Sequence, residues 1–201
     1  MEQFDYFVSF YSIVLGLSVV ELLTGTARTI EGRMVVKTSR LTLGLALFVS
    51  LDISSYWLQA WALYRQAPLS MAVITHGLIA AGSYFIAAYL VFPRAQKLKR
   101  GESRDDHFWS TRRWVFGAVL LTNVLNIGSL ALLSGGFGYM GSPGYIAFIS
   151  TFYIACAVAV VAPRGRVVVI ALGWLIAFSL IAILMDGLNA LENGRWSINP
   201  W

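Results

Sequence analysis

Charged residues are scarce in this chain. Asp, Glu, Lys and Arg make up 12% of the 201 residues, 58% of the residues are hydrophobic, and the mean hydropathy is +0.69. Ordinary soluble domains carry about 25% charged residues. A soluble domain of this size is therefore excluded, because apolar side chains would have to cover much of its surface. The class that remains is an integral membrane protein.

Cysteine is scarcer still, since Cys156 is the only one and lies inside an apolar run. An internal disulfide and a cysteine metal site are therefore excluded. A Gly-rich phosphate loop, HExxH, a Ser/His/Asp set and carboxylates paired at one depth are missing as well. The two histidines, His76 and His107, are expected on opposite sides of the membrane, so they cannot ligate one haem. We expect no cofactor and no metal; a non-enzymatic role is favoured, and an enzymatic one stays open.

Long apolar stretches are what the chain has in abundance. Six runs reach the length that a helix needs to cross a bilayer: residues 4–25, 41–64, 71–92, 114–133, 145–161 and 167–188. The alternation expected of a membrane β-barrel is missing. The first residues contain no Lys or Arg, unlike a cleavable signal peptide, so we expect the first run to remain. The fold class predicted is all-α, a single bundle of six transmembrane helices.

The basic residues are spread unevenly between the loops. Thirteen of the fifteen Lys and Arg fall in the first, third and fifth loops, and Arg65 and Arg195 are the exceptions. The positive-inside rule places those three loops in the cytoplasm and both termini on the outer side. The same rule explains the net charge of +5 without a nucleic-acid partner.

One acidic residue, Asp52, lies near the middle of the second run. It lies ~16 Å along the helix from the start of that run, near mid-bilayer. A charge at that depth costs at least ~2.5 kcal/mol. Ser55, Tyr56 and Gln59 share its side of the helix. We expect Asp52 to be a protonatable or cation-binding site, or else a hydrogen-bonded residue that joins helices, whether charged or neutral.

Asn123 and Asn126 lie three residues apart in the fourth run, at a depth similar to that of Asp52. A shared layer of Asp52, Asn123 and Asn126, extended by Ser55 and Gln59, is the best binding constellation that the sequence offers. Such a layer could coordinate a cation or hydrogen-bond a polar solute. The alternative is hydrogen bonding between helices, worth ~0.6 kcal/mol per side-chain pair on average.

His76 and Glu21 are secondary candidates. His76 is expected about two turns in from the outer face, on a side of small residues that suits a hydrogen-bonded histidine at a helix contact. Glu21 lies close to the basic first loop, where it is expected to pair with Arg28, Arg33 or Arg40.

The third loop is the most basic part of the chain. Basic residues beside a membrane attract anionic lipid at ~1 kcal/mol per charge, and a docking site for a cytoplasmic partner is the alternative. The residues expected to contact anionic lipid on the cytoplasmic side are Arg94, Lys97, Lys99, Arg100, Arg112 and Arg113.

Three segments carry a resemblance to a known family. They are SIVLGLSVVELLTGTAR (residues 12–28), DISSYWLQAWALYR (residues 52–65) and HFWSTRRWVFG (residues 107–117). These motifs resemble an uncharacterised family of small bacterial multipass membrane proteins. The resemblance implies a bacterial inner-membrane location, and it brings no activity and no functional residues.

Three functions remain open from the sequence. The first is a membrane-embedded binding or permeation module for a small ion or polar solute, homo-oligomeric, with the Asp52 layer as its site. The second is a structural or accessory subunit of a larger membrane complex. The third is a lipid-acting membrane enzyme, which would have to use the polar residues expected near the outer interface: Asp5, His76 and Asp186.

Overall fold

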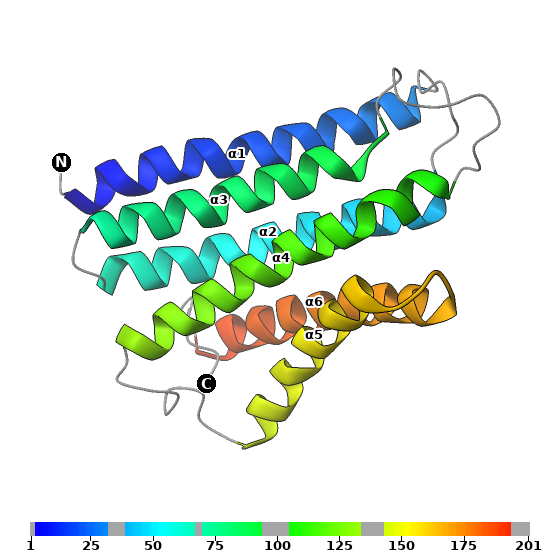
Figure 1. Ribbon diagram of the computed structural model, residues 1–201. Coiled ribbons are helices and arrows are strands. Elements are labelled where there is room, and N and C mark those ends of the chain that lie inside the picture. The colour runs from blue at the N-terminus through cyan, green and yellow to red at the C-terminus, as the bar shows by residue number, and fades with distance from the viewer. Residues whose placement is uncertain (1–2, 32–38, 67–69, 94–104, 134–142, 194–201) are drawn as a thin grey trace.

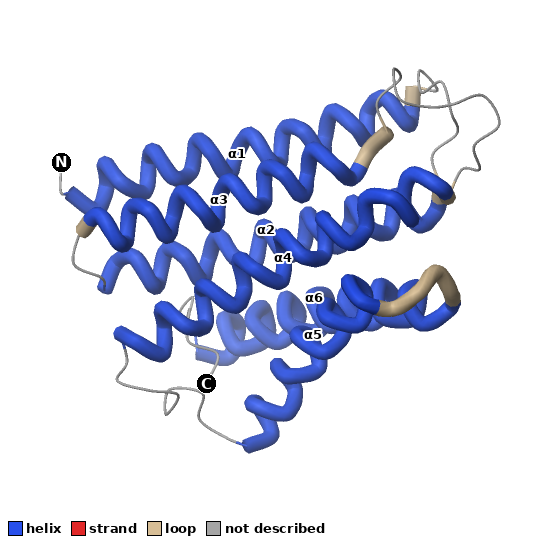
Figure 2. Tube along the Cα trace, viewed as in Figure 1, coloured by secondary structure: helices blue, strands red, loops and turns tan. Residues whose placement is uncertain are grey.

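The computed structural model describes residues 3–31, 39–66, 70–93, 105–133 and 143–193. Every regular element within these residues is a helix (Figure 2). The helices are α1 (Gln3–Ile30), α2 (Arg40–Gln66), α3 (Met71–Val91), α4 (Asp106–Leu133), α5 (Pro143–Val161) and α6 (Arg166–Asn193). All six are long and apolar enough to cross a membrane. Within these residues the predicted all-α architecture of six membrane-length apolar helices is confirmed, and it is consistent with a multi-pass membrane protein.

Helices α2 and α4 form the centre of the bundle (Figure 1). Helix α2 contacts α1, α3, α4 and α6, and α4 contacts α2, α3 and α5. Successive helices run in opposite directions, so the ends of α1, α3 and α5 meet the starts of α2, α4 and α6. We call this the basic end, because its described residues include Arg28, Arg40, Arg113, Arg164 and Arg166. The other end holds the starts of α1 and α3.

Helix α4 begins eight residues earlier than the predicted run from residue 114. The polar stretch that includes His107 was expected to be loop, and this prediction is wrong. The reason is that its side chains bind the exposed backbone ends of neighbouring helices, so a charged first turn is stable there. Helices α1 and α6 also extend beyond the predicted runs, to Ile30 and Asn193.

Two side chains near the start of α4 cap the ends of other helices. His107 Nε2 donates to the backbone carbonyls of Leu90 and Val91 at the end of α3, at 3.1 and 3.2 Å. The Arg112 guanidinium donates to the carbonyls of Ala159 and Ala162 at the end of α5. The last carbonyls of a helix have no partner within it, and a cation placed there also suits the helix dipole.

Two acidic side chains extend this fastening. Asp105 accepts a hydrogen bond from the Ser39 hydroxyl, whose oxygen in turn accepts the backbone N–H of Leu41 at 3.1 Å and so caps the start of α2. Asp106 forms an ion pair with Arg164, in the link between α5 and α6, at 2.6 Å. The start of α4 therefore contacts the start of α2, the ends of α3 and α5, and the link between α5 and α6.

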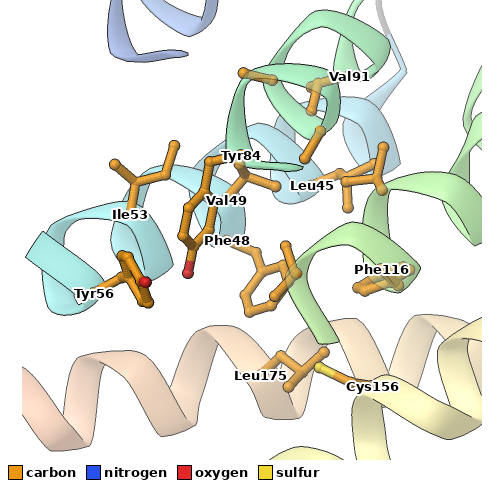
Figure 3. Packing of buried hydrophobic residues seen from close by; sticks show 14 of the residues in the cluster. Leu45, Phe48, Val49, Ile53, Tyr56, Tyr84, Val91, Phe116, Cys156 and Leu175 are labelled. Carbon is orange, nitrogen blue, oxygen red and sulfur yellow. The ribbon is translucent and has the colours of Figure 1, made fainter. Parts of the chain in front are cut away.

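Phenylalanine rings join the central helices to α5 and α6. Phe48 of α2 lies 5.7 Å from Phe116 of α4 and 6.3 Å from Phe152 of α5, measured between ring centroids. Phe152 lies 5.3 Å from Phe178 of α6. We call these four residues the phenylalanine seam. Figure 3 shows part of it within the larger apolar core, to which α3 and α6 also contribute.

Helices α1 and α3 approach closely near the basic end. A Cβ atom on Gly25 would overlap the ring of Phe92, the residue that ends α3. By contrast, a Cβ on Gly16 of the same helix would meet no atom within 4 Å. Gly25 therefore owes its place to a specific contact, because only a residue without a side chain lets the two helices approach this far.

Candidate functional site

Asp52 lies at mid-height of the central helix. It comes twelve residues after Arg40, or ~18 Å along a helix of 27 residues, and only 3% of its surface is exposed. Its position along α2 agrees with the depth expected from the sequence. A carboxyl group at this depth needs polar partners, because lipid tails and apolar side chains offer none.

Two neighbouring helices supply those partners. The Tyr84 hydroxyl of α3 donates to Asp52 Oδ2 at 2.6 Å, and Asn123 Nδ2 of α4 donates to the same oxygen at 3.2 Å. Asn123 Nδ2 also donates to the Val119 carbonyl at 3.0 Å. The opposite amide orientation would place an oxygen against both of these acceptors, so this network fixes the orientation of the Asn123 amide.

The site joins four helices and favours one kind of chemistry. The Tyr153 hydroxyl of α5 donates to the backbone carbonyl of Asn123 at 3.2 Å. This hydrogen bond adds α5 to the contacts of α2, α3 and α4. Among the described residues, both side chains bonded to the Asp52 carboxyl present hydrogens to it. A metal cation needs several oxygen lone pairs directed at one point. This arrangement instead suits a carboxyl group that gains and loses a proton.

The predicted layer divides into two pairs. Asn123 contacts Asp52, whereas Asn126 Nδ2 donates to Gln59 Oε1 at 2.7 Å. Gln59 is exposed and lies seven residues beyond Asp52, ~10 Å further along α2. Asn126 is 2% exposed, and its Oδ1 makes no hydrogen bond to a described residue. Ser55 does not join the site, because its hydroxyl donates to the Asp52 backbone carbonyl at 3.1 Å.

Tyr84 is the residue that the sequence reasoning missed. It is fully buried, and apart from Val91 the other buried residues of α3 are small: Gly77, Ala80, Ala81, Ser83, Ala87 and Ala88. Small residues let helices approach closely, and a tyrosine among them must direct its hydroxyl into the contact. That combination is the signal that could have identified it.

An uninterrupted line of aromatic residues leads away from Asp52. Tyr84 lies 5.1 Å from Tyr56, Tyr56 lies 6.4 Å from Tyr11, and Tyr11 lies 5.4 Å from Tyr64, between ring centroids. The Tyr64 hydroxyl lies 2.9 Å from His76 Nδ1. We call these five residues the tyrosine seam. It starts beside Asp52, midway along α2, and ends at His76, in the second turn of α3, away from the basic end.

Of the residues expected to bind anionic lipid, two are described. Arg113 is exposed, whereas Arg112 is buried at 2% exposure and directs its guanidinium at helix carbonyls. The structure therefore removes Arg112 from the set of lipid-facing cations. Its guanidinium also lies 5.4 Å from the Trp109 ring, which Arg164 approaches as well at 5.6 Å. Four of the expected residues lie outside the described part of the chain: Arg94, Lys97, Lys99 and Arg100.

The remaining candidate residues do not come together in one site among the described residues. Glu21 is half-buried in α1, and its pairing with a basic residue of the first loop stays a prediction. His76 is half-buried and bonded to Tyr64. The side chains of Asp5 and Asp186 lie outside the described part of the chain, so the lipid-enzyme constellation has no geometry to support it.

No protein-family model, curated protein or solved structure matches this chain. The resemblance of the three sequence motifs therefore stays an interpretation. What the structure adds is a physical reason for parts of them. Gly25 allows α1 to approach Phe92, and His107 and Arg112 cap the ends of α3 and α5.

Proposed function

We propose that this protein is a membrane-embedded binding or permeation module for a small ion, and that the ion is the proton. The observation that carries the proposal is the Asp52 carboxyl group, buried at mid-height and bonded to two hydrogen-bond donors, Tyr84 and Asn123. An ionisable residue inside a membrane domain is a functional candidate because of its cost.

The surroundings of Asp52 support a proton over a larger ion or solute. Tyr84 is fully buried and Asp52 nearly so, and a proton needs neither space nor a shell of oxygen ligands. Burial favours the neutral carboxylic acid, whereas the two donors favour the carboxylate. These opposing effects support a group that can exist in both protonation states.

We further propose the orientation that the basic loops predict. The basic end faces the cytoplasm, both termini lie outside, and the membrane is the bacterial inner membrane. Exposed Arg113 and the basic third loop contact anionic lipid headgroups there. Assembly into a homo-oligomer completes this proposal, and crosslinking in native membranes tests it.

Proton flux into proteoliposomes tests the proposed function. Purified protein is reconstituted with a pH-sensitive dye inside the vesicles, and the flux is measured under an imposed pH gradient. We expect Asp52→Asn to reduce the flux at least tenfold, because the amide keeps the shape but cannot exchange a proton. Ser55→Ala is the matched control, since its hydroxyl bonds the backbone three residues away. Equal flux in wild type and Asp52→Asn, or none in wild type, would refute proton permeation.

A further inference from the structure

We propose that the two partners of Asp52 have different roles: Asn123 is a fixed donor that positions the carboxyl group, and Tyr84 is the partner whose hydrogen bond reverses when a proton binds. This inference rests on the proposed role of Asp52. It adds the rearrangement by which the buried site holds both the carboxylate and the carboxylic acid.

Protonation reverses what a carboxyl group needs from its neighbours. A carboxylate only accepts hydrogen bonds, whereas the neutral acid also carries one O–H that needs an acceptor. Asp52 is buried, and a buried donor without an acceptor is unfavourable. A site that binds and releases a proton at this depth therefore needs a partner that can both donate and accept.

Asn123 cannot be that partner, because both hydrogens of its amide are already used. Nδ2 donates to the Val119 carbonyl at 3.0 Å and to Asp52 Oδ2 at 3.2 Å. Turning the amide over would place its oxygen against the Val119 carbonyl, and two acceptors cannot hydrogen bond to each other. The backbone of Asn123 is held as well, since its carbonyl accepts the Tyr153 hydroxyl of α5. Asn123 therefore stays a donor in both protonation states of Asp52.

Tyr84 can be that partner, because a phenolic hydroxyl both donates and accepts. Its oxygen lies 2.6 Å from Asp52 Oδ2, and its ring is fully buried. Among the described residues, the other hydrogen bonds to the carboxyl group come from Asn123 Nδ2, at 3.2 Å to Oδ2 and 3.5 Å to Oδ1. The Tyr84 oxygen is therefore the one acceptor that the described residues offer to the neutral acid.

The reversal needs one new covalent bond and one rotation. The incoming proton bonds to Asp52 Oδ2, the Tyr84 hydrogen turns away about its C–O bond, and the new O–H donates to the Tyr84 oxygen. No other covalent bond forms or breaks and no electron moves, so no co-reactant is required. Asn123 Nδ2 lies 3.5 Å from the same Tyr84 oxygen, so it faces this pair of oxygens as a donor before and after the exchange.

The other titratable side chains around Asp52 do not bond to its carboxyl group. Figure 3 shows the Tyr56 ring of α2 beside that of Tyr84. Tyr56 is equally buried, but its hydroxyl makes no hydrogen bond to a described residue. Cys156 of α5 is also buried nearby, and the hydrogen bonds to Asp52 within the described residues do not include its thiol. Tyr84 and Tyr56 thus differ in contact and not in burial, which makes Tyr56 a matched comparison.

Infrared difference spectroscopy tests the reversal in the full chain, held in lipid nanodiscs and carrying isotopically labelled tyrosine. Spectra at low and high pH are subtracted, and the acid band of Asp52 is identified by its loss in Asp52→Asn. We expect a tyrosine C–O band to shift together with the Asp52 band, to be lost in Tyr84→Phe and to be kept in the control Tyr56→Phe. In Tyr84→Phe the acid band should move to higher wavenumber, because its O–H has lost the acceptor.

The outcomes separate this inference from the proposed function. An Asp52 band that responds to pH without a tyrosine band, or with one that only Tyr56→Phe removes, overturns the reversal and leaves the proton-binding role in place. An Asp52 band that never responds to pH overturns both. If Tyr84→Phe fails to fold, the tyrosine band of the wild type and its loss in Asp52→Asn carry the test.

Discussion

The tyrosine seam and the phenylalanine seam contain aromatic residues that pack alike and differ by a hydroxyl. In the tyrosine seam neighbouring tyrosine rings are 5.1 to 6.4 Å apart, and in the phenylalanine seam the distances are 5.3 to 6.3 Å. The spacing of the rings is therefore similar in the two seams. The four phenylalanines carry no hydroxyl, whereas the four tyrosines lie between Asp52 and His76, so the two seams differ in polarity.

Each seam also includes a helix whose last carbonyls are capped at the basic end by a side chain of α4. On the tyrosine side His107 binds the end of α3, and on the phenylalanine side Arg112 binds the end of α5. Both come from the first two turns of α4. One stretch of sequence thus holds the two halves together, and the substitutions below change one half at a time.

The largest effect is expected from Arg112→Leu. It leaves the Ala159 and Ala162 carbonyls without the guanidinium, and hydrogen bonds to charged groups are worth ~1.5–3 kcal/mol each. We expect the free energy of unfolding in detergent to fall by ~3 kcal/mol, measured by circular dichroism during denaturant titration. Arg113→Leu is the control, because Arg113 is exposed. Equal stability of the two variants would show that Arg112 does not fasten α5.

A smaller loss is expected from Tyr84→Phe on the tyrosine side. It removes the 2.6 Å hydrogen bond to Asp52 and leaves Asn123 as the remaining donor. We expect a decrease in unfolding free energy of ~2 kcal/mol. In the double variant with Asp52→Leu the two losses should not add, because both substitutions remove the same hydrogen bond. Additive losses would mean that this hydrogen bond contributes little.

The reverse change, Phe116→Tyr, brings a hydroxyl into the phenylalanine seam. Phe116 is fully buried beside Phe48, so the new hydroxyl is buried among apolar side chains, at a cost of ~1–3 kcal/mol. We expect a loss near ~1.5 kcal/mol by the same denaturant titration. Phe85→Tyr is the comparison, because 37% of Phe85 is exposed. If Phe116→Tyr left the free energy of unfolding unchanged, the phenylalanine seam would tolerate a hydroxyl as well as the tyrosine seam does.

The smallest effect is expected from Gly25→Ala. The new methyl group would overlap the Phe92 ring, which must move, so we expect a loss of ~1 kcal/mol. Gly16→Ala is the matched control on the same helix. It should be neutral or stabilising by up to ~1 kcal/mol, since space is open there and alanine favours helix. In a Phe92→Ala background the overlap is absent, so adding Gly25→Ala should cost less free energy of unfolding than it does in the wild type. An equal loss in both backgrounds would show that the overlap with Phe92 is not the cause.

The overall architecture follows from the sequence because a bilayer imposes one length and one polarity on every spanning helix. Helix count, order and most boundaries are visible as apolar runs. The start of α4 is not, since Asp106, His107 and Arg112 read as a charged loop. They become helical because the ends of other helices come within their reach, and no local pattern carries that information.

The candidate site was only partly predictable for a similar reason. The cost of burying Asp52 and the depth of Asn123 can both be read from position along a helix, and they predicted a contact that the structure contains. The rotation of each helix about its own axis, which sets the direction of its side chains, cannot be read from position along the helix. It separates Asn126 and Gln59 from Asp52, turns Ser55 to the backbone, and brings Tyr84 to the carboxyl group instead.

The partners of Asp52 also follow it in the order of synthesis. Tyr84 comes 32 residues later and Asn123 comes 71 residues later. At ~5–20 residues per second the ribosome needs roughly 4–14 s to add Asn123. During that interval α2 must pass from the translocon with its acid unpaired or stay beside the channel, so assembly of this bundle depends on when its later helices arrive.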